Sequence, residues 1–179
     1  EFDKGVSEFF FVFPGLMFVF ILAALYTLSA EKIYKIGSVI MLLGMCMHAA
    51  VPATRIFVTV SILIYSLGEH MQLGMRNTLS LEYAREGHGG EALGLQNSVY
   101  QIGTLAGYAV IIVVFFCFSS APGLFRSVFW LTAAMIALGL FSSLHMTGHS
   151  ETDKTKSRFY FRKKYSKYYM LEVFYGARK

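Results

Sequence analysis

The sequence predicts an all-α protein that crosses a membrane several times, and three observations support this prediction. The chain of 179 residues is 55% apolar and only 15% charged, whereas soluble domains carry roughly 25% charged residues. Four stretches of 19 to 34 residues contain no charge, and they are 9–30, 36–54, 92–125 and 127–150. A fifth long stretch, 56–81, carries only Glu69 and Arg76. Because roughly 20 apolar residues cross a bilayer as a helix, five spans would use most of the chain and leave no room for a soluble catalytic domain.

The first two predicted spans form an antiparallel hairpin. The first, 9–30, contains Pro14-Gly15, which a membrane helix tolerates as a kink. A short charged turn, 31–35, leads into the second span, 36–51. In this second span Gly37 and Gly44 are seven residues apart and therefore share one helical face, where small residues permit close helix approach.

The third predicted span, 56–81, carries a polar stripe. Four side chains at i, i+4, i+7 and i+11 lie within about 60° of one another around a helix, and they are Tyr65, Glu69, Gln72 and Arg76. A carboxylate at the middle of a bilayer costs at least about 2.5 kcal/mol, so it normally faces a bundle interior or a water-filled cavity. Two interpretations remain open: Glu69 and Arg76 form a structural pair that locks this helix to a neighbour, or they belong to a substrate, ion or proton site. We expect the adjacent His70 to be a hydrogen-bonded packing residue.

The fourth predicted span, 92–118, has two faces. Polar side chains follow the same i, i+4, i+7, i+11 spacing on one of them, at Asn97, Gln101, Thr104 and Tyr108. Gly103 and Gly107 form a G-x-x-x-G on the other face, which predicts packing against another helix. The fifth span, 124–146, is apolar. His145 and the nearby His149 have the spacing of metal ligands on a helix, but no third ligand is local, so we predict no metal and no cofactor.

Basic residues predict the orientation of the spans. The tail, 147–179, contains nine Lys and Arg against three acids, which places it in the cytoplasm by the positive-inside tendency. Five alternating crossings then put 12 Lys and Arg inside and three outside, at Lys4, Arg55 and Arg126. The chain therefore divides into a helical bundle, 1–146, and a basic amphipathic cytoplasmic linker. The aromatic and basic residues of 158–179 favour a segment in the lipid headgroup region over one that binds nucleic acid.

Both chain ends are expected to be truncated, because the sequence begins at Glu1 without a signal segment and stops inside an amphipathic stretch. The two cysteines, Cys46 and Cys117, lie inside apolar runs, which excludes an extracellular disulfide scaffold. Intramembrane enzyme chemistry is disfavoured because H-E-x-x-H, G-x-S-x-G and paired aspartates are all missing from the sequence.

The order of these features resembles the major facilitator superfamily of secondary transporters. Residues 69–74, Glu-His-Met-Gln-Leu-Gly, are similar to the family's fourth-helix pattern Arg-x-x-Gln-Gly, although Glu69 stands where the family has arginine. Residues 91–95, Glu-Ala-Leu-Gly-Leu, resemble the Arg-Ala-Leu-Gly that opens the fifth helix. Residues 102–107, Ile-Gly-Thr-Leu-Ala-Gly, are similar to the glycine motif of that helix, without its proline.

The resemblance implies that the chain is helices two to six of such a transporter plus part of the central linker, so that its five helices belong to a six-helix half-bundle. It implies transport of a small solute by alternating access around a midplane site, with protons as the candidate coupling ion through Glu69. The expected site residues are Glu69, Arg76, Gln72, Tyr65, Asn97 and Gln101. The expected partners are the lipid bilayer of the plasma (inner) membrane, the solute, protons and the missing remainder of the transporter, and no nucleic acid. The alternatives are a polytopic receptor, an assembly factor or an intramembrane enzyme without transport activity.

Overall fold

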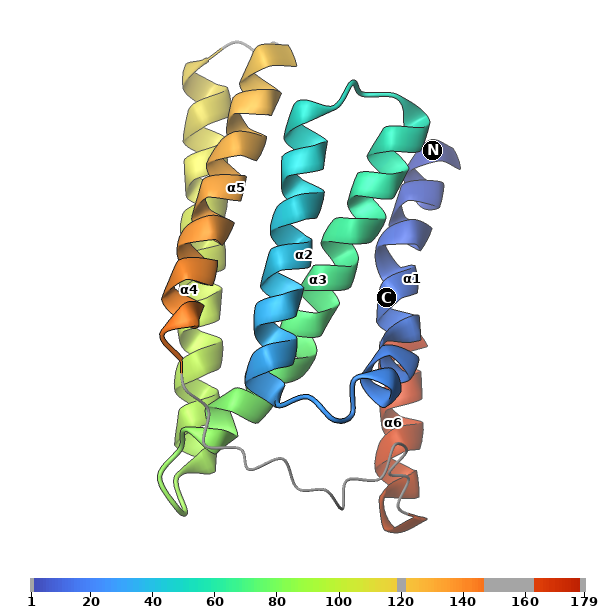
Figure 1. The fold of residues 1–179 in the computed structure, drawn as a ribbon, viewed down its shortest axis with the longest axis vertical. Helices are drawn as coiled ribbons and strands as arrows, with labels where there is room; N and C mark the ends of the chain where they lie inside the picture. Colours follow the sequence, from blue (N-terminus) through green and yellow to red (C-terminus); the bar gives the residue numbers. More distant parts are fainter. Residues whose placement is uncertain (1, 119–121, 147–162, 178–179) are drawn as a thin grey trace.

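The computed structural model describes residues 2–118, 122–146 and 163–177. Every regular element in those ranges is a helix (Figure 1). Their bounds are α1 Phe2–Ala24, α2 Ala30–Ala50, α3 Arg55–Glu82, α4 Gly89–Cys117, α5 Pro122–Leu144, the 3-10 helix η1 Lys163–Tyr165 and α6 Ser166–Ala177. Four of them, α2 to α5, are long and apolar enough to cross a membrane. The prediction of an all-α protein with several membrane-length helices is confirmed at this level.

The helix α1 differs most from its predicted span. The sequence predicts a span over 9–30, but the helix runs from Phe2 to Ala24. Its apolar part, Glu8–Ala24, is shorter than the four membrane-length helices. Counting uncharged residues misplaces both ends, because lysine and glutamate are good helix formers and because uncharged residues also make up the connection 25–29. The described residues therefore do not establish a fifth membrane-length helix.

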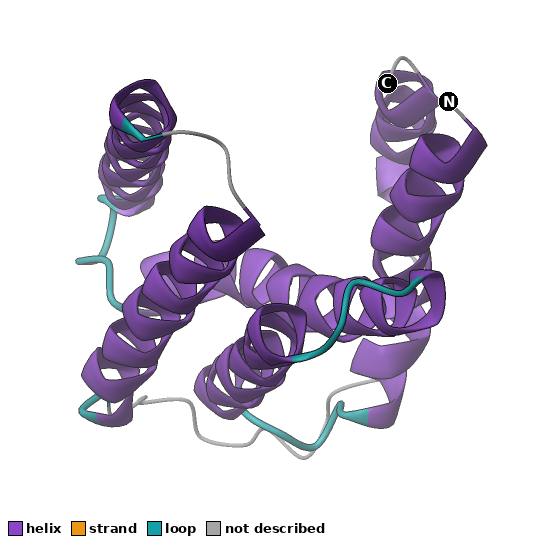
Figure 2. Cartoon of the chain, turned by 90° about the horizontal axis from the view of Figure 1, so that it is seen from above, coloured by secondary structure: helices purple, strands orange, loops and turns teal. Residues whose placement is uncertain are grey.

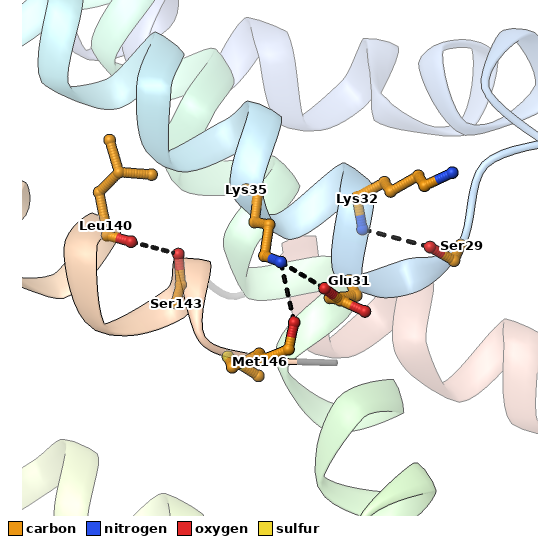
Figure 3. A network of polar contacts seen from close by, with 7 residues as sticks. All are labelled: Ser29, Glu31, Lys32, Lys35, Leu140, Ser143 and Met146. Carbon is orange, nitrogen blue, oxygen red and sulfur yellow. Dashed lines mark hydrogen bonds and ion pairs between the residues drawn. The ribbon is translucent and has the colours of Figure 1, made fainter. Parts of the chain in front are cut away.

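The charged segment that the sequence places in a turn is instead the beginning of α2 (Figure 3). Ser29 is the N-cap, and its side-chain oxygen accepts a hydrogen bond from the Lys32 backbone N–H at 3.4 Å, which is the role that serine fills best at a helix start. Lys35 pairs with Glu31 one turn earlier, and its Nζ donates to the Met146 carbonyl oxygen at 2.9 Å. These contacts tie the start of α2 to the chain just after α5.

Glycines bring α2 and α3 into close contact, and this is the most extensive helix pair of the described chain. A Cβ atom built on Gly44 would lie 2.4 Å from the Tyr65 backbone nitrogen. A Cβ built on Gly68 would lie 2.4 Å from the Met41 backbone nitrogen and 2.5 Å from the Gly37 carbonyl oxygen. Only residues without a side chain permit this approach. The predicted close-approach face of Gly37 and Gly44 is confirmed.

The helix α1 reaches α3 beside its internal proline. Pro14 has no N–H, so the carbonyl four residues earlier loses its helical donor, and the Ser66 hydroxyl of α3 donates to the neighbouring Phe11 carbonyl. His70 Nδ1 donates to the Ser66 carbonyl oxygen at 2.8 Å. The same imidazole fills the space beside Gly15, where a Cβ would lie 2.5 Å from Nε2. The prediction that His70 is a hydrogen-bonded packing residue is confirmed.

The buried apolar core lies where α2 begins and α3 ends. Its buried members are Ala30, Ile33, Met71, Met75 and Leu79. Phe18 and Leu22 of α1 pack against them. The three core residues of α3 are four positions apart and share one face, and the predicted polar stripe lies about a quarter of a turn further round the helix. The core therefore holds the stripe in a fixed direction relative to α1 and α2.

The helix α4 stands at the edge of the helix group (Figure 2), and none of its residues is buried. A Cβ built on Gly103 or on Gly107 would meet no neighbouring atom within 4 Å. No described part of the chain makes the packing predicted for these two glycines, and that packing stays a prediction. A G-x-x-x-G spacing makes room for a close partner, but it does not supply one.

The connections alternate between the two ends of the bundle (Figure 1). The connections 25–29 and 83–88 lie at the same end as the close of α5, and the connection 51–54 lies at the other end with the start of α5. Arg55 and Arg126 are thereby separated from Lys32, Lys35 and Arg85. The predicted separation of basic residues is present, and the end that faces the cytoplasm stays a prediction.

Thiol labelling tests the orientation. We would introduce cysteine at Gly90 or at Ala53, which are exposed at opposite ends, in a background without Cys46 and Cys117. In intact cells Gly90→Cys should react only with membrane-permeant reagents, and Ala53→Cys should also react with impermeant ones, because the basic end is expected inside. Both should react after permeabilisation. Labelling of Gly90→Cys by an impermeant reagent in intact cells would overturn the orientation.

The described part of the tail is helical, while 147–162 lies outside the described residues. After η1, the helix α6 exposes large apolar side chains at Tyr168, Met170, Leu171 and Phe174. Lys163, Lys164 and Lys167 are exposed beside them. An exposed helix that mixes apolar and basic side chains is typical of a segment that lies on a membrane surface.

A peptide of residues 158–179 should therefore gain helicity on anionic vesicles, because a helix as short as α6 is marginal in water. Each Lys or Arg near the surface contributes about 1 kcal/mol, so added salt should weaken binding. Circular dichroism and vesicle co-sedimentation measure the two effects, with neutral phosphatidylcholine vesicles as the control. Equal, salt-independent binding to both vesicle types would show that the aromatic side chains alone drive it.

Candidate functional site

The predicted polar stripe is a row of half-buried side chains on α3. Its members are Tyr65, Glu69, Gln72 and Arg76, none fully buried and none fully exposed. The row extends over about 16 Å of helix at 1.5 Å per residue. Glu69 lies near the middle of α3, which runs from Arg55 to Glu82. Glu69 is thus at mid-length of a helix long enough and apolar enough to cross a membrane.

Gln72 fixes the stripe to α2. Its Nε2 donates to the Ser38 hydroxyl oxygen at 2.6 Å, and Ser38 in turn donates to the Tyr34 carbonyl oxygen at 2.9 Å. Ser38 is 1% exposed, so the hydrogen bond is shielded from water and holds the two helices in register. Sequence reasoning did not single out Ser38. The sequence feature that could have indicated Ser38 is its position directly after Gly37, where α2 and α3 approach each other closely.

Glu69 has a carboxylate oxygen without a partner. Its Oε2 is buried and accepts no hydrogen bond from any described residue. An unsatisfied buried polar atom costs about 1–3 kcal/mol, and more when it is charged. Such a group in the middle of a membrane-length helix is a candidate to contact a solute or to exchange a proton.

Arg76 is held by an aromatic ring rather than by an acid. Its guanidinium carbon lies 4.2 Å from the centre of the Tyr100 ring of α4, a cation–π contact worth about 0.5–2 kcal/mol. Its Nε and Nη1 are buried and find no hydrogen-bond partner in the described ranges. Tyr34 of α2 lies within electrostatic range of the guanidinium. Two guanidinium nitrogens, which carry three N–H groups between them, are thus unused within the described chain.

Glu69 and Arg76 do not pair. No ion pair joins them in the described chain, and seven intervening steps separate them by about 10.5 Å along the helix. The interpretation that they lock α3 to a neighbour as a structural pair therefore finds no support in these contacts. An acid and a base with unused hydrogen-bonding capacity remain on one helix face.

The α4 residues predicted for the site lie elsewhere. Asn97 and Gln101 are exposed and contact no member of the stripe through a described hydrogen bond. Tyr100 makes the contact with Arg76. Gln96, four positions before Tyr100, has a buried Nε2 without a partner in the part of the chain described. The face of α4 that carries buried polar atoms and meets α3 is thus one residue, about 100°, away from the predicted one.

This arrangement can bind a small polar solute or exchange a proton. It offers a carboxylate acceptor at one level of α3 and guanidinium donors two turns away, with the Tyr100 ring against the guanidinium. Among the described side chains no group of three or more His, Cys, Asp or Glu is close enough to hold a metal ion. His149, which has metal-ligand spacing to His145 in the sequence, lies outside the described residues.

Comparison with protein-family models, curated proteins and solved structures gives no match to this chain. The resemblance to the major facilitator superfamily therefore rests on the sequence motifs alone.

Proposed function

We propose that the chain is part of a secondary transporter of the major facilitator type, which moves a small solute across the plasma (inner) membrane by alternating access. The observation that carries the proposal is the buried, unpartnered Glu69 Oε2 in the middle of a membrane-length helix. Intramembrane acids are costly and normally serve a pathway or a relay. Arg76, with two buried donors on the same face, supports a polar solute.

In this proposal Glu69 is also the proton-exchanging group. A carboxyl group that changes its hydration or its partner between two conformations changes its proton occupancy, which couples proton movement to the conformational cycle. The tail is cytoplasmic in the same proposal, since nine basic residues follow the last membrane-length helix. The rest of the transporter would supply the other wall of the cavity.

An accumulation assay tests the function. The protein from the complete reading frame would be reconstituted in vesicles and offered a panel of organic ions, sugars and drug-like cations, with and without an imposed pH gradient. Mass spectrometry of the washed vesicles measures uptake, and protein-free vesicles give the background. We expect at least one solute to accumulate above background and to do so more strongly under the gradient.

The assay also separates the alternatives. Exchange of a solute without any effect of the gradient would keep transport and remove proton coupling. If folded protein takes up no solute of the panel, and the complete reading frame encodes six spans or fewer, the receptor or assembly-factor alternative is favoured over transport.

A further inference from the structure

A cavity of about 610 Å³ opens at the end of the bundle opposite the basic connections. It is formed by the last turns of α2, the connection 51–54, the first turns of α3 and the first turns of α5. Its lining residues are mostly apolar, with Val51, Phe57, Phe125 and Phe129 among them. No residue of the stripe lines the cavity, and Ser61, the lining residue furthest along α3, is one turn, or about 6 Å, from Tyr65 at the near end of the stripe. The cavity is therefore separate from the stripe.

Three polar side chains line this cavity: His48, Ser61 and Arg126. The Ser61 hydroxyl donates to the Val58 carbonyl oxygen at 2.9 Å, so its oxygen accepts from His48 Nδ1, which is 2.6 Å away. The imidazole also stands edge-on to the Phe129 ring, with the ring centres 4.6 Å apart. Through these contacts the imidazole joins α2 to α3 and α5. The three helices that form the cavity wall are therefore fixed relative to one another, as in a preformed site.

The charge of the cavity has one sign. Among the described residues, Arg126 is the only fully charged one that lines the cavity, and no described aspartate or glutamate lines it. Arg126 is exposed, and no described residue forms an ion pair or a hydrogen bond with its guanidinium. A guanidinium binds phosphate oxygens in a bidentate manner. The site therefore selects a molecule with an anionic head and an apolar body.

We propose that this cavity binds the phosphate headgroup of an anionic phospholipid from the adjoining leaflet, with the start of an acyl chain against Phe57, Phe125 and Phe129. The ends of membrane-length helices lie at the headgroup level, where phospholipid is the most abundant amphiphile. A guanidinium between helices at that level suits an anionic headgroup, because it can bind two phosphate oxygens at once. Among the described residues no carboxylate lines the cavity, so the ammonium group of a zwitterionic lipid would find no ion pair there.

Lipid titration of the full chain in detergent tests the proposal. The midpoint of thermal unfolding would be followed with dihexanoyl-phosphatidylglycerol, with dihexanoyl-phosphatidylcholine of the same chains, and with inorganic phosphate. We expect a saturable rise with phosphatidylglycerol, a smaller one with phosphatidylcholine and none with phosphate. Equal effects of the two lipids would overturn the proposal, and so would an effect of phosphate as large as that of phosphatidylglycerol, which would indicate a free-anion site.

Three variants locate the site. Arg126→Gln should weaken phosphatidylglycerol binding at least tenfold, and Arg85→Gln, which removes an exposed base at the other end, should leave it unchanged. Gly123→Leu should narrow the cavity and abolish the rise, since Gly123 lines the cavity and a Cβ built on it meets no described atom within 4 Å; thermal unfolding without lipid checks that the variant folds. Unchanged phosphatidylglycerol binding by either Arg126→Gln or Gly123→Leu would contradict the assignment.

Discussion

Replacing Gly44 by alanine should lower the free energy of unfolding by about 1–3 kcal/mol, which is the usual cost of overpacking a tight contact. The added Cβ would lie 2.4 Å from the Tyr65 nitrogen and 2.7 Å from its Cα. Backbone atoms cannot rotate aside as a side chain can, so α2 and α3 must separate along their shared face. Thermal unfolding in detergent and the monodisperse fraction in size-exclusion chromatography measure the loss.

Gly107→Ala is the matched control, because it adds the same methyl group to a membrane-length helix. No atom lies within 4 Å of its Cβ, so its stability should stay within about 0.5 kcal/mol of wild type or rise slightly through helix propensity. Gly68→Ala, at the same α2–α3 contact, should behave like Gly44→Ala. The double variant should cost less than the two single effects together, since one separation relieves both overlaps. Wild-type stability of Gly44→Ala would refute the close approach.

Replacing Glu69 by glutamine should abolish proton-driven accumulation while solute exchange continues. One proton per solute supports about a tenfold accumulation for each pH unit across the membrane, which corresponds to about 1.4 kcal/mol, and glutamine keeps the shape of the side chain without the exchangeable proton. The measurement is uptake in vesicles containing the complete protein, with and without a gradient, using the solute found in the accumulation assay. Accumulation at the wild-type level under the gradient would reduce Glu69 to a structural residue.

Glu86→Gln is the control for this second experiment, because Glu86 is exposed in the connection 83–88. It should accumulate solute as the wild type does. Thermal unfolding separates a coupling defect from a folding defect: since a buried carboxylate without a partner is costly, Glu69→Gln should be at least as stable as the wild type. A destabilised Glu69→Gln would instead indicate that the carboxylate holds the fold together.

The sequence predicts the membrane-length helices and the glycine face of α2 because both depend on local composition. A run of about 20 uncharged residues suits only the bilayer as a helix. Gly37 and Gly44 lie on one face whatever the rest of the chain does, and α3 meets them there. The half-buried stripe with Glu69 follows from the same reasoning, since a polar face on an apolar helix avoids lipid.

The face of α4 is not predictable in this way. Gln96, Asn97 and Ser98 are consecutive, and Tyr100 and Gln101 follow after Val99, so polar residues at helical spacing define more than one face of α4. The position of Arg76 on the neighbouring helix selects Tyr100. The beginning of α2 is misplaced for a related reason: charges that look like a turn form a helix once Ser29 caps it. The cavity beside His48 joins segments that are about 75 residues apart in sequence, which no local pattern records.

α3 is packed between other helices whereas α4 is exposed, and this difference predicts how substitutions are distributed in relatives of this chain. α3 packs against α1, α2 and α4. A substitution at one of its contact positions therefore changes the side-chain volume between two helices, and only side chains of similar size are accepted there. Along α4 no residue is buried, and an exchange of leucine, isoleucine, valine or phenylalanine changes little there as long as the helix stays apolar. Homologues should therefore vary more in the apolar identities along α4 than at Gly68 and Gly74 of α3, where a Cβ would lie 2.4 Å from the Met41 backbone nitrogen and 2.2 Å from a ring carbon of Phe18.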